Sequence, residues 1–493
     1  MMSIIKMNPF SIPEIISLVG GFLDLADLLS CIRVSKAFHN TLVKPIWKRV
    51  TVGSAYHTEP TFEAVQNHKK HIEKLEFYNI FPKEYRSMQG CDRLKYIGYY
   101  VRFSQDSSAL SNLSNLIRAH SSTITELRFY YSEIQGLWRT LLECTHLEVL
   151  SICEIQIHKD EVDLFFQVCK KIRDLRMTSV SISQLPSNFL NDDMDEYILP
   201  NMKKLILHTV QIINPPHPHT SSSCLGMLTR RCPKLRSLDF CDYSWDTFET
   251  SQQRYVDFYR SVFLHHPYTL TNLSDLRLTG MKTKDEDMAA LLRQMTALRQ
   301  LIVQQCDFGP LSIRELLADE QEISDCGHLV RKRRDQRLCD TIEKMHFNIN
   351  STRADGIVQM VLSNCPRLKE LHGPKITVTE IVDGAKWVST GLTSLSILLE
   401  ADVNQDTSEG MQKQRIAFRQ LGKLTQLNSL ILTGFPRSRK IRTLDFRLKS
   451  GLDELVNLKS LYRLSFEGDK HQRMHLEDET WIKNNWPNIR DFN

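Results

Sequence analysis

A short phrase of apolar and polar residues recurs along most of the chain. In each copy, one apolar residue is followed three positions later by a second, and a short alternating run comes next, as in Leu147–Ile152, Leu235–Phe240 and Leu427–Leu432. Alternation of this kind predicts a β-strand with one buried face. The second apolar residue of each copy, called the mark below, is present in fourteen copies: Leu75, Ile97, Leu127, Leu150, Leu175, Leu205, Leu238, Leu276, Leu301, Met345, Leu371, Leu395, Leu430 and Leu464.

The closest marks are 22 to 26 residues apart, and helix-like runs such as Glu161–Lys170 and Ala289–Met295 precede some of them. One strand and one helix at this period are typical of leucine-rich repeats. We therefore expect an α/β fold over residues 71–493, an irregular solenoid of about 14 repeats. Its parallel strands should line a concave face and its helices a convex face. At about 4.8 Å per strand, the inner arc would measure roughly 65 Å, which suits a protein or long peptide.

Residues 8–50 have a different, helical pattern. Ser11, Pro13 and Glu14 predict a helix start with a capping box, Asp24 and Asp27 predict a second start, and a third helix is expected from about Ser35 to Val43, stopped by Pro45. Such a small unit cannot bury all of its apolar residues in one core. It therefore requires a partner surface or the next domain.

This pattern resembles the F-box, which in that family docks on the small Skp-type adaptor of a cullin-based ubiquitin ligase. The resemblance covers about a tenth of the chain, and Gly20-Gly21 and Leu25 depart from the usual pattern. The matching residues are Ile12-Pro13-Glu14, Phe22-Leu23, Asp27-Leu28-Leu29, Arg33 to Phe38, and Trp47. The resemblance implies that the adaptor contact contains Ile12, Pro13, Ile15, Leu25, Leu28, Leu29 and Val34.

The whole chain resembles the F-box/leucine-rich-repeat substrate receptors, and most of all their fungal branch. In this interpretation it consists of an F-box (8–50), a connecting segment (51–70) and irregular leucine-rich repeats (71–493). The resemblance implies a receptor that holds a protein substrate near the ligase and performs no chemistry. The alternative from the binding class is an interaction scaffold without a ubiquitin role, whose N-terminal helices only cap the solenoid. The receptor hypothesis predicts an exposed apolar face of Ile12, Leu25, Leu28 and Leu29, whereas the scaffold predicts that the first helices are buried on residues 71–100.

The substrate surface is expected on the strand residues that flank the buried marks, because successive side chains of a strand point to opposite faces. These candidates mix charged and aromatic side chains, as interfaces do. They are Arg128, Tyr130, Arg176, His208, Asp239, Arg277, Gln304 and His346.

Composition narrows the function further. A net charge of +5 in 493 residues predicts neither nucleic-acid nor membrane binding, and no stretch approaches the run of about 20 apolar residues of a membrane helix. The twelve cysteines are scattered, which favours the cytoplasm and/or the nucleus. Those just before marks, such as Cys232 and Cys365, are expected to pack in turns. The basic run Arg331–Arg337 is either a nuclear localisation signal or acidic-partner site, or a solvated helix or loop.

No nucleotide-binding, zinc-protease or serine-hydrolase motif is present. We therefore expect a non-catalytic protein with no cofactor and no metal.

Overall fold

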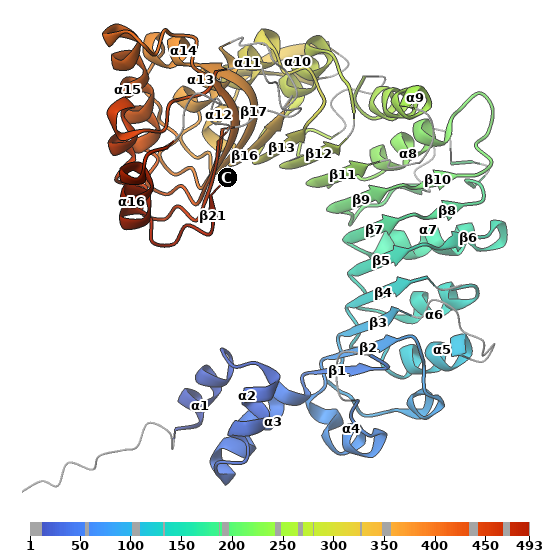
Figure 1. The fold of residues 1–493 in the computed structure, drawn as a ribbon. Helices are drawn as coiled ribbons and strands as arrows, with labels where there is room; N and C mark the ends of the chain where they lie inside the picture. The colour runs from blue at the N-terminus through green and yellow to red at the C-terminus, as the bar shows by residue number, and fades with distance from the viewer. Residues whose placement is uncertain are drawn as a thin grey trace, which may run out of the picture. The chain divides into compact units, whose positions relative to one another are not determined.

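A computed structural model gives the fold of the chain (Figure 1). The described residues are 12–54, 59–100, 109–131, 134–186, 188–189, 197–241, 248–264, 270–279, 281–325, 328–347, 356–432, 442–466 and 474–492. The chain forms two compact units. The first comprises Met1–Met202 and Thr209–Pro218, and the second comprises Lys203–His208 and His219–Asn493.

The first unit begins with three helices, α1 (Pro13–Gly20), α2 (Leu25–Cys31) and α3 (Lys36–Trp47). Asp24 caps α2 by accepting a hydrogen bond from the Asp27 amide, as predicted. The N-cap of α1 is Ile12, which makes no side-chain hydrogen bond, and the predicted cap Ser11 lies outside the described residues. The predicted stop at Pro45 was wrong, because α3 continues through this proline to Trp47. A proline in the last turn removes one hydrogen bond, which the end of a helix tolerates better than its middle does.

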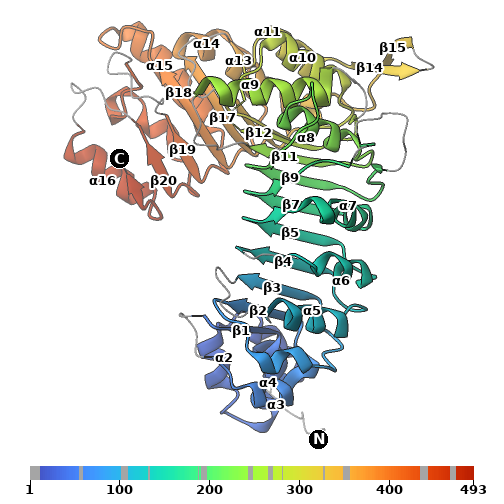
Figure 2. The ribbon, with the colours of Figure 1, turned by 90° about the vertical axis from the view of Figure 1, so that its right-hand side faces the viewer.

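A parallel sheet follows, with strands in the order β1-β2-β3-β4-β5-β7 and helices along one of its faces (Figures 1 and 2). A second row of short parallel strands, β6, β8 and β10, lies beside it. The elements are β1 (Arg49–Val52), α4 (Phe62–His68), η2 (Lys69–His71), β2 (Lys74–Tyr78), η3 (Lys83–Ser87), β3 (Tyr96–Tyr100), α5 (Ala109–Ala119), β4 (Glu126–Tyr130), α6 (Leu137–Glu143), β5 (Val149–Cys153), β6 (Gln156–Ile157), η4 (Lys159–Glu161), α7 (Val162–Lys171), β7 (Asp174–Thr178), β8 (Ser181–Ile182) and β10 (Gln211–Ile212).

The marks of this unit lie side by side. Leu75 is paired with Ile97, and the same register continues through Leu127, Leu150 and Leu175, all of them fully buried. The predicted strands are thus confirmed, and their marks lie in one register. The sheet begins one strand earlier than expected, because β1 places Val50 against Leu75; residues 51–70 therefore contain the end of β1 and helix α4.

A left-handed turn ends several strands of this unit. The residue four positions after the mark has a positive φ in four repeats of the unit's main sheet, and none of these residues is glycine. For residues other than glycine this conformation costs roughly 1–2 kcal/mol. The residues are Asn79 (φ 61°), Tyr131 (φ 59°), Glu154 (φ 54°) and Ser179 (φ 52°).

The second unit repeats the same plan. Its parallel sheet has the order β9-β11-β12-β13-β16-β17-β18-β19-β20-β21, and helices again cover one face (Figure 2). The elements are β9 (Lys204–His208), α8 (Ser221–Arg230), β11 (Ser237–Cys241), α9 (Phe248–Tyr259), η6 (Arg260–Leu264), β12 (Asp275–Thr279), α10 (Asp285–Gln294), β13 (Gln300–Val303), α11 (Pro310–Leu317), β14 (Glu320–Asp325), β15 (His328–Arg333), α12 (Leu338–Thr341), β16 (Lys344–Phe347), α13 (Ile357–Asn364), β17 (Glu370–Thr377), α14 (Val378–Asp383), β18 (Ser394–Glu400), α15 (Ser408–Gly422), β19 (Ser429–Ile431), η7 (Leu448–Ser450), η8 (Leu452–Leu455), β20 (Arg463–Ser465), α16 (Leu476–Asn485) and β21 (Asp491–Phe492).

The nine marks of the second unit are also in one register, from Leu205 to Leu464, and each is at most 1% exposed. The register ends with Phe492 of β21, a strand that the repeat pattern did not reveal. All fourteen predicted marks are therefore strand residues of the buried face.

The basic run is exposed except at Arg334, and its second part, from Arg334 to Arg337, is a loop, in agreement with the prediction of a solvated helix or loop. Its first residues form β15, which pairs antiparallel with β14 as a hairpin, and Arg331 of this hairpin forms an ion pair with Glu322. Arg334 is 5% exposed, and its guanidinium donates to the carbonyls of Glu315 (2.9 Å), Ala318 (3.1 Å) and Leu292 (2.8 Å). Burial lowers the pKa of Arg334. This residue fixes the base of the hairpin to the solenoid.

Carboxylates at helix starts hold neighbouring repeats together. Asp285, in the first turn of α10, accepts hydrogen bonds from the amides of Gly309 (2.7 Å), Leu311 (2.9 Å) and Ser312 (3.0 Å) at the start of α11. Glu161 accepts in the same way from the Gly136 amide at the start of α6 (2.6 Å). Each such bond satisfies amides that a helix start leaves unpaired.

The cysteines that the structure describes are free, and ten of the eleven are buried. Cys232 donates a hydrogen bond to the Leu228 carbonyl (3.6 Å), and burial raises the pKa of its thiol. The packing role predicted for Cys232 and Cys365 agrees with this burial. In the described part of the chain, no helix is both long and apolar enough to cross a membrane.

Candidate functional site

The three N-terminal helices share a very small core. Ile16, Leu28 and Leu42 are buried in it. Helix α1 approaches α3 at Gly20, where a Cβ atom would lie 2.4 Å from Leu42 Cδ2. The glycine that interrupts the helical pattern therefore permits this close contact. Partly buried side chains complete the core: Leu23, Cys31, Ile32, Phe38 and Ile46.

Several large apolar side chains of this module are left exposed. Leu18 is 67% exposed, Phe22 84%, Leu25 50%, Leu29 41% and Val34 69%. Single exposed leucines are common on protein surfaces, whereas several large apolar side chains within one small module are unusual. The exposed apolar side chains of the N-terminal module, defined as α1–α3, are together called the module surface below.

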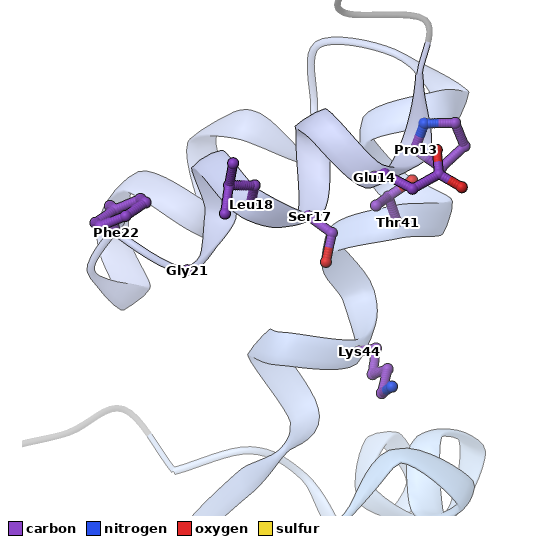
Figure 3. Close-up of a pocket in the computed structure, with 8 residues that line it drawn as sticks. All are labelled: Pro13, Glu14, Ser17, Leu18, Gly21, Phe22, Thr41 and Lys44. Atoms are coloured by element: carbon purple, nitrogen blue, oxygen red, sulfur yellow. The ribbon is translucent and has the colours of Figure 1, made fainter.

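Two hollows lie on the N-terminal module. The first, of about 730 Å³, is drawn in Figure 3, where Leu18, Gly21 and Phe22 of α1 and the turn after it lie along one side and Lys44 of α3 lies beyond Ser17. The second, of about 450 Å³, contains Leu25 and Leu29 together with the end of α3 and β1. Apolar side chains line both hollows, together with Glu14 and Lys44 in the first and Arg49 in the second.

Most residues of the predicted adaptor contact lie at the surface of the module, and the contact itself stays a prediction. Pro13, Leu25, Leu29 and Val34 are exposed, and Ile12 and Ile15 are half-buried. The prediction of an exposed face was wrong for Leu28, which is 6% exposed because it packs against Ile16 and Leu42. The sequence analysis missed Leu18 and Phe22 as surface residues. The glycine pair gave a signal for Phe22, because it ends α1 before this ring.

In the first unit, tyrosines cluster on the sheet face opposite the helices, called the open face below. The ring of Tyr100 stacks between Tyr78 (4.6 Å) and Tyr130 (4.9 Å), and its hydroxyl lies 2.7 Å from that of Tyr96. Gly98 lies between Tyr96 and Tyr100 and leaves room for both, because a Cβ there would lie 2.6 Å from the Tyr100 ring. Burial raises the pKa of Tyr96, so its hydroxyl stays protonated.

A cation lies over this tyrosine cluster, and a second arginine lies on the same face two strands away. The Arg128 guanidinium lies 5.4 Å from the Tyr96 ring centre and forms an ion pair with Glu126 (2.6 Å). Arg176 is paired with Asp174 (2.7 Å). The predicted residues Arg128, Tyr130 and Arg176 therefore all lie on the open face. Tyrosine and arginine together are the residue types that dominate protein interfaces.

The open face of the second unit has a polar hollow of about 480 Å³. Asp239 stands in it between His208, whose Nε2 lies 3.0 Å from Oδ1, and Arg277, whose Nε lies 3.7 Å from Oδ2. These three predicted residues are thus brought together. Gln304 is not on a strand, because β13 ends at Val303 and Gln304 lies in the following turn.

The last predicted residue, His346, belongs to a cluster that the sequence analysis did not find. Its Nε2 lies 2.8 Å from Glu370 Oε1, and the His372 Nε2 lies 3.4 Å from the same oxygen. Burial and the neighbouring histidine lower the pKa of His346, and burial lowers the pKa of His372. Both imidazoles are therefore neutral at pH 7. Glu370 and His372 flank a mark as Lys344 and His346 do, which is the signal that could have revealed them.

Comparisons with known proteins give matches among solved structures alone. No protein-family model matches the chain, and no curated protein matches it. Among solved structures, an internalin (inlF) from Listeria monocytogenes is 16% identical, with a TM-score of 0.32, over 55% of this chain and 73% of its own.

The leucine-rich-repeat ectodomain of the Arabidopsis receptor kinase HAESA, in complex with a peptide hormone, is 12% identical with a TM-score of 0.36, over 90% of this chain and 68% of its own. A TLR13–ssRNA13 complex is 13% identical with a TM-score of 0.35, over 82% of this chain and 68% of its own. The fold itself is established by the marks and their register. The chain has a leucine-rich-repeat fold.

Proposed function

We propose that this chain is the substrate-recognition subunit of a Skp–cullin–F-box ubiquitin ligase, in which the N-terminal module binds the Skp-type adaptor and the open face binds a protein substrate. The chain performs no chemistry in this proposal. It raises the effective concentration of a substrate lysine near the ubiquitin that the ligase carries.

The module surface is the observation that supports this proposal most. A module whose buried core consists of Ile16, Leu28 and Leu42 leaves Phe22 84% exposed and Val34 69% exposed. Covering an apolar side chain of this size contributes about 1.5–3 kcal/mol. A protein that covers several of them gains enough free energy for a stable complex. Because this segment resembles the F-box, we propose that the covering protein is the Skp-type adaptor.

The open face supports the substrate half of the proposal. In the first unit it offers a row of tyrosines with Arg128 over the Tyr96 ring, and in the second a polar hollow with Asp239 and Arg277. Rigid aromatic anchors next to paired charges suit a folded protein or a peptide.

A second candidate function is an interaction scaffold whose N-terminal helices only cap the solenoid. One observation favours it: the end of α3 packs on the first repeat, with the Trp47 ring stacked on His68 at 4.5 Å. The exposed residues of α1 and α2 favour the receptor instead, because a cap buries its apolar face.

We propose the cytoplasm and/or the nucleus as the site of action. The free, buried cysteines of the described residues fit a reducing compartment. The Arg331–Arg337 run gives little support to a nuclear signal, because Arg334 is buried.

Co-purification of the full chain with a Skp-type adaptor tests the proposal. The variant Leu25→Asp/Leu29→Asp changes two exposed residues of the module surface and should abolish the complex without unfolding the chain. Leu476→Asp is the matched control, because Leu476 is 78% exposed on α16 in the second unit; it should leave the complex intact. A folded wild-type chain that does not retain the adaptor would favour the scaffold.

A further inference from the structure

The open face of the second unit contains two histidines and a carboxylate on adjacent strands. The register of β16 and β17 pairs Lys344 with Glu370 and His346 with His372. Residues two apart on a strand point to the same face, and neighbouring strands are about 4.8 Å apart. Glu370, His372 and His346 therefore converge because of their positions in the sheet, and no loop is needed to bring them together.

Their ligand atoms lie close to the separations of a metal site. The Nε2 atoms of both histidines face the same oxygen, Glu370 Oε1, at 2.8 Å and 3.4 Å. One ligand atom from each of the three residues lies within 4.8 Å of the other two. Ligands bound at about 2.0–2.2 Å from a tetrahedral ion are roughly 3.3–3.6 Å apart. An ion can therefore be accommodated with side-chain movements of about an ångström.

Neighbouring residues orient these side chains as metal ligands. Lys344 Nζ holds the other carboxylate oxygen, Oε2, at 2.6 Å and so turns Oε1 toward the histidines. Polar partners of this kind orient metal ligands in known sites. His346 is 6% exposed, so this ligand is held within the sheet surface by its neighbours.

We propose that His346, Glu370 and His372 form a zinc-binding site with three protein ligands. Imidazole nitrogen with one carboxylate favours zinc over magnesium or calcium, which prefer all-oxygen sites. The remaining coordination position faces the open face, where water or a side chain of a bound protein completes the site. The two imidazole rings are now parallel, with centres 3.8 Å apart and planes at 6°, so the ion must tilt them toward each other.

Titration of the purified full chain with Co²⁺ and Zn²⁺ tests the site, since Co²⁺ in a zinc site gives visible absorption bands. We expect one equivalent of Co²⁺ to produce these bands, Zn²⁺ to displace it, and Zn²⁺ to raise the thermal unfolding temperature. His372→Ala and Glu370→Gln should each weaken Zn²⁺ binding at least about tenfold. Circular dichroism checks that both variants are folded.

His208→Ala is the matched control, because His208 and Asp239 are a histidine–carboxylate pair on the same open face. This variant should bind Zn²⁺ like the wild-type chain. The proposal is overturned if the wild-type chain binds no Co²⁺ or Zn²⁺, or if both cluster variants bind with unchanged stoichiometry and affinity. The test uses the chain alone and is therefore independent of adaptor binding.

Discussion

Replacing Asp285 by alanine is expected to destabilise the second unit by about 3–4 kcal/mol. Three backbone amides of the first turn of α11, those of Gly309, Leu311 and Ser312, donate to this carboxylate at 2.7–3.0 Å. Helix α11 has no side-chain cap of its own at Gly309. A net contribution of about 1 kcal/mol for each bond gives the lower value, and the favourable position of the charge at a helix start adds about 0.3–1 kcal/mol.

Acid should remove this stabilisation. Burial alone would raise the pKa of Asp285, but the hydrogen bonds from Ser312, Leu311 and Gly309 outweigh it, and the pKa is lowered. The stabilisation is therefore complete above the unfolded pKa of about 3.9 and is lost as the pH falls through the lower folded value. The difference between wild type and Asp285→Ala should be constant near neutral pH and shrink below about pH 4.

Urea unfolding followed by circular dichroism measures the difference, and hydrogen exchange of the α11 amides locates it, since long repeat arrays can unfold in steps. Glu286→Ala is the control, because Glu286 is an exposed acidic residue in the same turn of α10. It should change the stability by less than about 0.5 kcal/mol. Equal effects of the two substitutions would refute the role of Asp285 as the cap of α11.

Two further predictions concern stability and are read from urea unfolding midpoints. Arg334→Met should lower the free energy of unfolding by about 2–4 kcal/mol, because three carbonyls lose a buried charged donor. The control Arg331→Ala removes an exposed ion pair and should lower it by less than about 1 kcal/mol. Similar losses in the two variants would contradict the buried role of Arg334. Glu154→Gly and Ser179→Gly should leave the free energy of unfolding unchanged or raise it by up to about 1 kcal/mol. Both residues have a positive φ, which glycine adopts without the steric penalty of a side chain. A decrease of more than about 1 kcal/mol in both variants would contradict this account.

The repeat architecture could be predicted because its signal is local and periodic. A mark is recognised from an apolar residue three positions before it, and fourteen copies together make the prediction of a repeat strong. Two strands of the main sheets, β1 and β21, were missed. The phrase is present at β1, as Trp47, Val50 and Val52, but its first residue belongs to α3 and therefore to the stretch with a helical pattern. At β21 only the apolar pair Ile489 and Phe492 is present, which is weak evidence for a strand.

The sites were harder to predict because they depend on tertiary contacts. Nothing in the sequence distinguishes Leu28 from Leu25 and Leu29 in a helix of two turns; the packing of α1 on α3 through Gly20 decides which leucine is buried. The cluster around Glu370 required the register between β16 and β17. That register follows from the marks, so an alignment of the repeats on their marks would have shown that these residues are neighbours.

The central claim is that the N-terminal module binds a Skp-type adaptor, and a calorimetric titration of the full chain with purified adaptor tests it most directly. We expect one adaptor per chain with a Kd of about 1 µM or tighter, equivalent to about −8 kcal/mol. Leu25→Asp/Leu29→Asp should weaken binding at least about a hundredfold, and Leu476→Asp should leave it unchanged. A folded chain that gives no binding at an adaptor concentration of about 100 µM would contradict the claim.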